Sequence, residues 1–230
     1  MPYFSIIIPA YNEEKYLRKT LHSLKGQTMQ DFEVIVVANG CTDGTEDIVK
    51  KRVNEKMRLL SLAKPNVCVA RNAGALNAQG KILIFLDADT DLDAQALAAI
   101  RQEFTQRHAI GTACVKPDDE QFKFKLVMGL KNVLMKAGVY QGFGGIVICH
   151  KEQFQSVQGY NPESTIKEHH HLRRKLRDKG TYICVSTTVT TSMRRFKEWS
   201  LLKASLFWMR QNIKFYARRP LEDGKYEQIR

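Results

Sequence analysis

The sequence lacks paired cysteines, long apolar runs and a basic leader. Its five cysteines are scattered over 230 residues and never form a C-x-x-C pair. This argues against a disulfide framework and a structural zinc site, and for a reducing compartment. No run approaches the roughly 18 apolar residues that a membrane span needs, and the start, MPYFSIIIPAYNEE, does not resemble a signal peptide. These absences predict a cytoplasmic protein.

Acidic residues are also in deficit. Aspartate and glutamate number 24 against 36 lysines and arginines, which gives a formal net charge of +12. A basic surface suits nucleic acid, an anionic membrane face or phosphorylated small molecules, and it also serves solubility alone. The chain has no zinc-finger, basic-zipper or aromatic RNA-binding signature, so nucleic acid is not an expected partner.

Short apolar runs alternate with helical patterns in the first half of the chain. The expected strands are 4–8, 33–37, 57–62 and 82–86, and helical spacing follows each of them. This order predicts an α/β fold with a mostly parallel central sheet, helices on both faces, and a ligand site at the carboxyl ends of the strands. In the less regular second half we expect strands at 110–115, 142–150 and 181–186, and helices at 120–138 and 166–178. Residues 1–195 are predicted to form one domain.

Carboxylates crowd the end of the most apolar strand. The segment FLDADTD places Asp87 and Asp89 directly after the run ILIFL. Like charges this close repel, and a bound Mg²⁺ or Mn²⁺ would remove that cost, because both ions accept carboxylate and phosphate oxygens. A D-x-D pattern alone is common, and Asp91 or Asp93 fits equally well as the cap of the next helix. After a buried strand the pattern is more specific and predicts a metal site.

Other strand ends carry polar groups that suit a nucleotide. Between them they offer an aromatic ring, amide groups, a carboxylate and the guanidinium of Arg71, which fit base stacking, hydrogen bonding and charge. Each of these residues taken singly fits a turn, a cap or a surface position, and their joint occurrence is the signal. The segments are Pro9-Ala10-Tyr11-Asn12-Glu13 after the first strand, Asn39-Gly40 after the second, and Ala70-Arg71-Asn72-Ala73-Gly74 before the fourth.

In this order the motifs resemble the inverting family 2 glycosyltransferases, which have the GT-A fold. The resemblance rests on SIIIPAYNEEKYL, VIVVANGCTDGT and ARNAGALNAQGKILIFLDAD, then on GFGGIVICHKEQFQSVQGYNPE, KEHHHLRRKLRDKG and SMRRF. It implies transfer of a sugar from a nucleotide-diphosphate sugar to a hydroxyl acceptor with a divalent cation, Mn²⁺ or Mg²⁺. It implies that Asp89 and Asp87 ligate the metal. The nucleotide-sugar site would comprise Pro9, Ala10, Tyr11, Asn12, Glu13, Asn39, Arg71, Asn72, Gly74, Asp87 and Ala88.

The sequence departs from the family at the expected catalytic base. That base is usually an aspartate after a glutamate at the start of a late helix, and here the pair is Glu168 and His169, followed by His170 and His171. Imidazole, with a reference pKa of about 6.5, can accept a proton at neutral pH, so the base is expected to be His169 or Glu168. The alternatives are that His169 and His171 bind a metal, or that the protein is a weak or inactive nucleotide-sugar-binding relative.

A second departure lies after the second strand. Family members often carry Asp-Asp-Gly-Ser there, and a carboxylate accepts the uracil N–H, whereas this chain has Ala38-Asn39-Gly40-Cys41. Asn39 offers a carbonyl acceptor without the charge. A UDP-sugar is therefore the favoured donor, and a GDP-sugar stays open. A nucleotidyltransferase would need a glycine-rich loop where PAYNEEKYL stands, and a glycosidase would need carboxylates that flank the sugar bond.

The basic tail, residues 196–230, contains a helical pattern over 196–219. Lys203, Arg210 and Lys214 fall on a different face from the apolar stripe. Such a helix suits an anionic membrane surface, packing on the domain, or pairing with a second chain. The first reading would place the protein at the inner face of the membrane, with a lipid-linked or polysaccharide precursor as acceptor. The expected stripe is Trp199, Leu202, Leu206, Met209, Ile213 and Tyr216.

Overall fold

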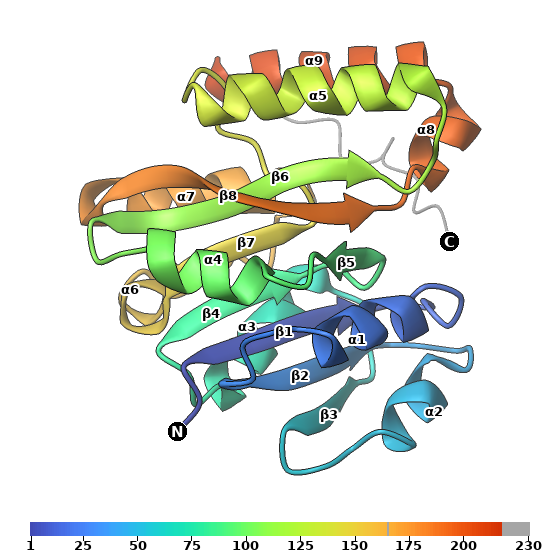
Figure 1. Cartoon of the computed structure of the whole chain (residues 1–230), viewed down its shortest axis with the longest axis vertical. Coiled ribbons are helices and arrows are strands. Elements are labelled where there is room, and N and C mark those ends of the chain that lie inside the picture. The colour runs from blue at the N-terminus through green and yellow to red at the C-terminus, as the bar shows by residue number, and fades with distance from the viewer. Residues whose placement is uncertain (165, 218–230) are drawn as a thin grey trace.

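The first half of the computed structural model is a regular α/β unit (Figure 1). The structure describes residues 1–164 and 166–217, except the side chains of residues 201, 202 and 216. The predicted strands and helices of this half are present and alternate as expected. They are β1 (Phe4–Ala10), α1 (Leu17–Lys25), β2 (Phe32–Asn39), α2 (Thr45–Lys50), β3 (Met57–Leu62), α3 (Val67–Asn77) and β4 (Ile82–Leu86).

The second half adds four strands and several helices to the same sheet. The expected strands and helices here are again present. A three-residue strand, β5, and a six-residue helix, α6, were not predicted, because both are too short to show a periodic pattern. The elements are β5 (Thr90–Leu92), α4 (Ala96–Glu103), β6 (His108–Pro117), α5 (Phe122–Lys136), β7 (Ile146–His150), α6 (Lys151–Ser156), α7 (Glu168–Leu176), β8 (Thr181–Thr191), α8 (Arg194–Trp199) and α9 (Leu201–Tyr216).

The sheet confirms the α/β class. Its strand order is β3-β2-β1-β4-β7-β6-β8-β5. The pairs within β3-β2-β1-β4 are parallel, as is β6–β8, whereas β7 is antiparallel to both of its neighbours and β5 is antiparallel to β8. Because β1, β2 and β4 are parallel, their carboxyl ends meet at one edge of the sheet, which is where the polar motifs lie.

Alternation along β1 divides the core into two layers. Ile6 and Ile8 face one layer together with residues of α1 and α4, and Ile7 faces the other with residues of α3 and α7. Gly74 is needed for the second layer, because a Cβ there would lie 2.4 Å from Cγ2 of Ile7. Its role in this structure is therefore the close approach of α3 to β1.

The expected helix over 196–219 is interrupted. Ser200 has φ of 63° and separates α8 from α9, and the Ser200 hydroxyl accepts a hydrogen bond from the Lys203 N–H. Trp199 is buried, but Leu206, Met209 and Ile213 of the expected stripe are exposed. Leu202 and Tyr216 lie outside the described side chains. The face of α9 that packs inward instead carries Ala204, Gln211 and Phe215.

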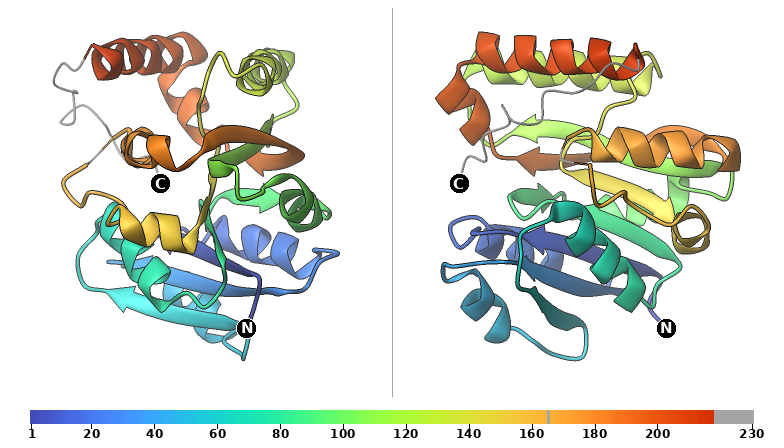
Figure 2. Two further views of the ribbon diagram at one scale, coloured as in Figure 1. Left: turned by 90° about the vertical axis from the view of Figure 1, so that its left-hand side faces the viewer. Right: turned by 180° about the vertical axis from the view of Figure 1, so that it is seen from behind.

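Helices α5 and α9 lie at the same end of the molecule, beyond the β6–β8 part of the sheet, and are separated from each other (Figures 1 and 2). Within the described residues, no helix is both long and apolar enough to cross a membrane.

Candidate functional site

A cavity of about 1300 Å³ opens at the carboxyl edge of the sheet. Pro9, Asn39 and Asp87 line it from the ends of β1, β2 and β4, and residues of α5, α7 and α9 form the opposite walls. Cavities for one small molecule usually measure about 300–1000 Å³. This volume therefore leaves room for a second molecule beside a nucleotide-sized ligand.

Most of the predicted site residues line this cavity. Four do not, and each has another role in the fold. Asn72 exchanges hydrogen bonds with the backbone of Tyr160 at 2.8 and 2.9 Å, Asn12 bonds Thr42, Gly74 packs on β1, and Ala10 is fully buried. The predicted residues in the cavity wall are Pro9, Tyr11, Glu13, Asn39, Arg71, Asp87, Ala88, Asp89, Glu168 and His169.

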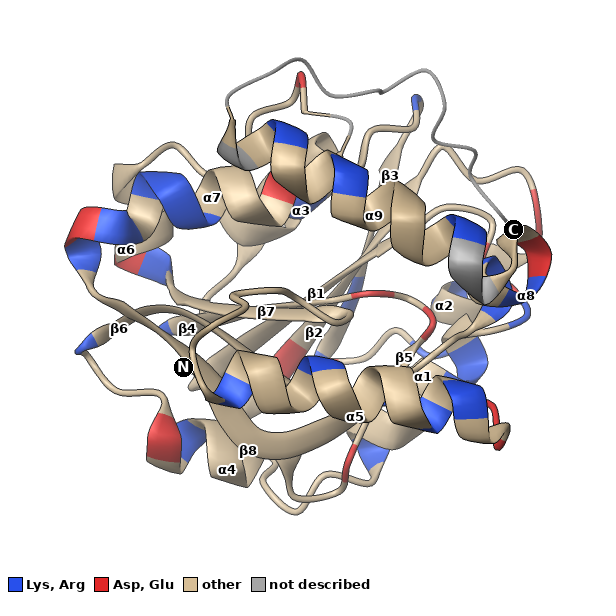
Figure 3. Ribbon diagram, turned by 90° about the horizontal axis from the view of Figure 1, so that it is seen from above, with Lys and Arg blue, Asp and Glu red and all other residues tan. Residues whose placement is uncertain are grey.

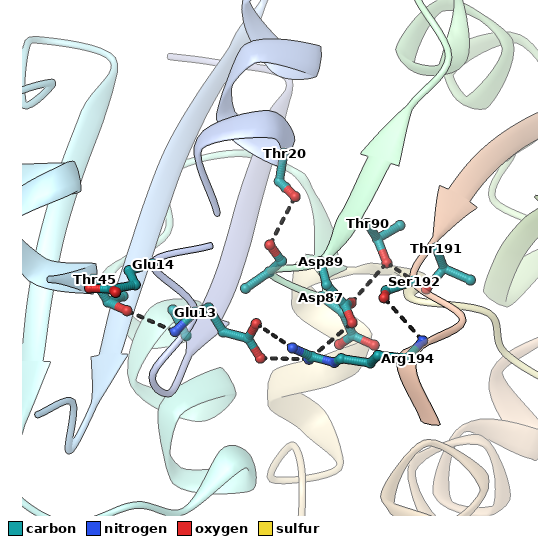
Figure 4. A network of polar contacts seen from close by, with 12 residues as sticks. Glu13, Glu14, Thr20, Thr45, Asp87, Asp89, Thr90, Thr191, Ser192 and Arg194 are labelled. Carbon is teal, nitrogen blue, oxygen red and sulfur yellow. Dashed lines mark hydrogen bonds and ion pairs between the residues drawn. The ribbon is translucent and has the colours of Figure 1, made fainter. Parts of the chain in front are cut away.

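Three carboxylates gather on one side of the cavity, and an arginine contacts two of them (Figure 4). Nη1 and Nη2 of Arg194 donate to the two oxygens of Glu13 at 2.9 and 2.7 Å, and Nη2 lies 3.0 Å from Oδ2 of Asp89. Burial raises the pKa of Asp89 to about 7, although Arg194 opposes that shift. Burial also raises the pKa of Asp87. Ionisation of Asp87 and Asp89 is therefore less favourable than in water, and a bound cation would make it more favourable.

We call the carboxylates of Glu13, Asp87 and Asp89 the acidic group. It fits a divalent cation only together with a bound molecule. Asp87 and Asp89 offer hard oxygen ligands, of the kind that Mg²⁺ and Mn²⁺ accept. Across the described part of the chain, no three His, Cys, Asp or Glu side chains are arranged to hold a metal by themselves. Magnesium sites often use one or two carboxylates and complete the shell with phosphate oxygens and water. Asp91 takes no part, because its carboxylate pairs with Lys19 at 2.6 Å.

Arg71 connects the acidic group to the start of α7. Its Nη2 donates to Oδ1 of Asp87 at 3.1 Å and its Nη1 donates to Oε1 of Glu168 at 2.9 Å. The guanidinium side chain is only 4% exposed and lies 5.3 Å from the Tyr160 ring centroid. The buried Arg71 guanidinium thus pairs with two carboxylates, Asp87 just after β4 and Glu168 at the start of α7.

The three histidines of α7 have three different environments. His169 lines the cavity, and its Nδ1 lies 3.0 Å from the hydroxyl of Tyr160. His170 is buried against Phe143 and Phe215, and His171 lies against Phe215 with ring centroids 5.0 Å apart. The three rings have different partners, and in the part of the chain that the structure describes no three His, Cys, Asp or Glu side chains are placed to hold a metal.

The proton on His169 can be placed from its neighbours. Burial raises the pKa of Tyr160, so the phenol keeps its proton and donates to Nδ1. Burial and the Arg71 charge lower the pKa of His169, so the ring is neutral. The Tyr160 hydroxyl beside Nδ1 and the Glu168 carboxylate on the Nε2 side together favour the tautomer with its proton on Nε2. That Nε2 lies 3.7 Å from Oε1 of Glu168. The ring therefore presents an N–H to the carboxylate and has no lone pair left on that side.

Cations in the cavity wall were missed by the sequence reasoning. Arg194 belongs to the quoted motif SMRRF, but nothing local shows that it meets Glu13, 181 positions away. Lys131 and Lys167 also line the cavity, and burial lowers the pKa of each amine to about 8. Isolated lysines give no signal in a sequence with 36 basic residues. All three add positive charge around a cavity with an acidic group on one side.

Comparisons with known proteins agree with this geometry. The family model described as Glycosyl transferase family 2 matches residues 5–155. The glycosyltransferase GlyA of Streptococcus pneumoniae is 32% identical over 107 residues, which are 46% of this chain and 15% of GlyA. Chondroitin synthase of Pasteurella multocida is 33% identical over 117 residues, which are 50% of this chain and 12% of that protein. The matched stretches are therefore small parts of these relatives.

Solved structures share the fold. Mannosyltransferase PcManGT from Pyrobaculum calidifontis, in complex with GDP-Man and Mn²⁺, superposes with a TM-score of 0.76 at 19% identity, over 95% of this chain and 65% of that one. TarS of Staphylococcus aureus, in complex with UDP-GlcNAc, superposes with a TM-score of 0.65 at 22% identity, over 84% of this chain and 59% of that one. At these identities the likeness establishes the fold, which is of the GT-A type.

Proposed function

The chain belongs to glycosyl transferase family 2, and we propose from that membership that it transfers a sugar from a nucleotide-diphosphate sugar to a hydroxyl group, with inversion at the sugar carbon. A UDP-sugar is the proposed donor, and a GDP-sugar is the alternative. Pro9, Tyr11 and Asn39 would hold the nucleoside at the ends of β1 and β2. Asn39 Oδ1 also accepts the Asn66 N–H at 2.7 Å, which fixes the orientation of the amide.

The donor diphosphate is proposed to lie beside Asp87, Asp89 and Arg194. A divalent cation on Asp89 and Asp87 would stabilise the negative charge of the leaving diphosphate. Arg71 and Arg194 are the chain's own cations at this point, and both are anchored by carboxylates that keep their guanidinium groups in place. Fixed positive groups stabilise developing charge without reorganising during the reaction.

Glu168 is proposed as the base, with His169 as its positioning residue. The acceptor oxygen would attack the sugar carbon as the bond to the diphosphate breaks, and the acceptor proton would pass to the Glu168 carboxylate. Burial raises the pKa of Glu168, but the Arg71 guanidinium at 2.9 Å and a backbone N–H hydrogen bond outweigh that effect and keep the pKa below the usual value. The group is therefore ionised at neutral pH. The Nε2–H of His169 orients the carboxylate rather than removing the proton itself.

The observation that carries this proposal is the single cavity in which Arg71 joins the acidic group to Glu168. The test is nucleotide release from a panel of UDP- and GDP-sugars with Mn²⁺ or Mg²⁺ and no acceptor. We expect slow release from one donor, abolished by chelator and by Asp89→Asn. Asp91→Asn is the matched control, because Asp91 is two residues away and pairs with Lys19 outside the cavity.

The alternative of a binding-only relative predicts a different result. It would give donor-dependent thermal stabilisation but no release with any donor, even after acceptor candidates are added. If no nucleotide sugar either binds or turns over, or if Asp91→Asn abolishes release as fully as Asp89→Asn does, the assignment of the acidic group is wrong.

A further inference from the structure

Helices α5 and α9 each carry a row of exposed apolar residues. On α5 the row is spaced by three and four residues and lies opposite the buried side chains of Phe124, Met128 and Met135. On α9 the row lies opposite Ala204 and Gln211. The residues are Phe122, Leu126, Leu130 and Val133 on α5 and Leu206, Met209 and Ile213 on α9, and they are between 50% and 77% exposed.

The two helices that carry these rows both line the cavity. Val127 and Lys131 of α5 line one wall, and Trp208 and Asn212 of α9 line the opposite wall. Met209 and Ile213 of the α9 row reach the rim of the same cavity, whereas Leu206 and the α5 row lie outside it. Seen from above, the two helices run apart from each other on two sides of the molecule (Figure 3), and residues of both line the cavity. Exposed apolar surface of this extent is uncommon on a protein that has no partner. The apolar rows therefore mark a surface that something covers, at the entrance to the site.

The charge on these helices is of one sign. Neither α5 nor α9 contains an aspartate or a glutamate. Figure 3 shows their basic residues in blue. Apolar rows bordered by lysine and arginine are typical of helices that lie in the plane of a bilayer, with apolar side chains among the acyl chains and cations at anionic headgroups. The basic residues are Lys123, Lys125, Lys131 and Lys136 on α5 and Lys203, Arg210 and Lys214 on α9.

We propose that α5 and α9 together dock the protein on an anionic membrane surface, with the mouth of the cavity toward the bilayer. A second copy fits this surface less well, because a symmetric dimer would bring the surface lysines and arginines of α5 and α9 face to face with the same residues of the other copy. Nucleic acid would leave the apolar rows uncovered. A docked protein would receive its acceptor from the membrane. That consequence depends on the proposed transferase activity, whereas the docking itself does not.

The proposal is tested by flotation of the full chain with phosphatidylcholine vesicles, with and without phosphatidylglycerol. We expect binding to the phosphatidylglycerol vesicles at low salt, weaker binding as salt rises, and little binding to pure phosphatidylcholine. Leu126→Gln/Leu130→Gln removes two side chains that are exposed and lie outside the cavity wall. It should reduce vesicle binding by at least about tenfold.

Leu76→Gln on α3 is the matched control. Leu76 is 80% exposed and belongs to α3, which lies at the other end of the molecule from α5 and α9 (Figure 2), so this variant should bind vesicles like the wild type. Circular dichroism of each variant shows whether it is folded. Donor-dependent nucleotide release without vesicles should be unchanged by Leu126→Gln/Leu130→Gln, which separates loss of docking from loss of the site.

Other outcomes would overturn the proposal. They are a wild-type protein that stays unbound with phosphatidylglycerol vesicles at low salt, and binding that the α5 variant retains. A dimer in light scattering that Leu126→Gln/Leu130→Gln dissociates would show that a second copy covers the surface instead.

Discussion

Replacing Glu168 by glutamine tests the assignment of the base most directly. Glutamine keeps the size of the side chain and an oxygen that can accept from Nη1 of Arg71, now 2.9 Å away, but it cannot take a proton. General-base catalysis is worth about 10²–10⁴-fold. Because the Arg71 charge lowers the pKa of Glu168 and outweighs the opposing effect of burial, Glu168 is a weak base, and we expect the lower end, a loss of about 10²-fold in kcat.

Replacing His169 by glutamine should have a smaller effect. The N–H of His169 lies 3.7 Å from Glu168, so the variant loses an orienting contact and not the base. We expect a loss of about tenfold or less in kcat, because a contact at 3.7 Å is weaker than an ordinary hydrogen bond. KM for the donor should be unchanged in both variants, because neither side chain is proposed to contact the nucleotide.

The assay is steady-state nucleotide release under saturating donor and cation, with thermal unfolding of each variant as the control for folding. The reasoning would be refuted by the reverse order of effects, in which His169→Gln loses 10²-fold or more and Glu168→Gln stays near wild type. Near-normal turnover in both variants would remove the whole pair from the mechanism.

Further predictions concern pH and stability. The Asp89 pKa of about 7 means that a cation must displace a proton from this carboxyl group below that pH. Mn²⁺ affinity with nucleotide present should therefore fall about tenfold per pH unit below 7 in calorimetric titrations. An affinity that does not change between about pH 5 and 8 would contradict this. Burial raises the pKa of Glu33, but hydrogen bonds from Ser5, Gln79 and Arg58 lower it by more than burial raises it. The resulting pKa lies below the reference value. Glu33 therefore stabilises the fold above about pH 4.5, and this contribution is lost as pH falls through the lowered pKa. Glu33→Gln should cost about 1–3 kcal/mol in urea unfolding at pH 7 and progressively less in acid, whereas an equal cost at both ends of the range would show that charge is not involved.

Much of the fold follows from local patterns. The apolar runs of β1, β2 and β4 are long enough to identify buried strands, and the helical spacing between them requires parallel neighbours. The same order places Asp87 and Asn39 at one edge of the sheet without any knowledge of contacts. The second half was predicted with less detail, because β5 and α6 are too short for periodicity to appear.

The α9 helix shows where local patterns fail. Its apolar period was visible in the sequence, but Leu206, Met209 and Ile213 are exposed, and the inward face contains Gln211. A helical stripe shows that residues share a face, and it does not show whether that face meets protein or solvent. The surrounding elements decide this. Here Met209 and Ile213 of α9 reach the rim of the cavity, whereas the apolar row of α5 lies outside it.

The sequence by itself determined the class of the fold, the edge of the sheet that carries the site and the residue types available there, because strand periodicity and chain order are local properties. Only the tertiary structure decided which carboxylates share a cavity, since Asp89 faces Arg194 while Asp91, two residues on, faces Lys19. It also decided the roles of the histidines, because the proton position on His169 depends on Tyr160 and Arg71. Those partners are brought together by packing between β4, α3 and α7, and no short stretch of sequence contains that information.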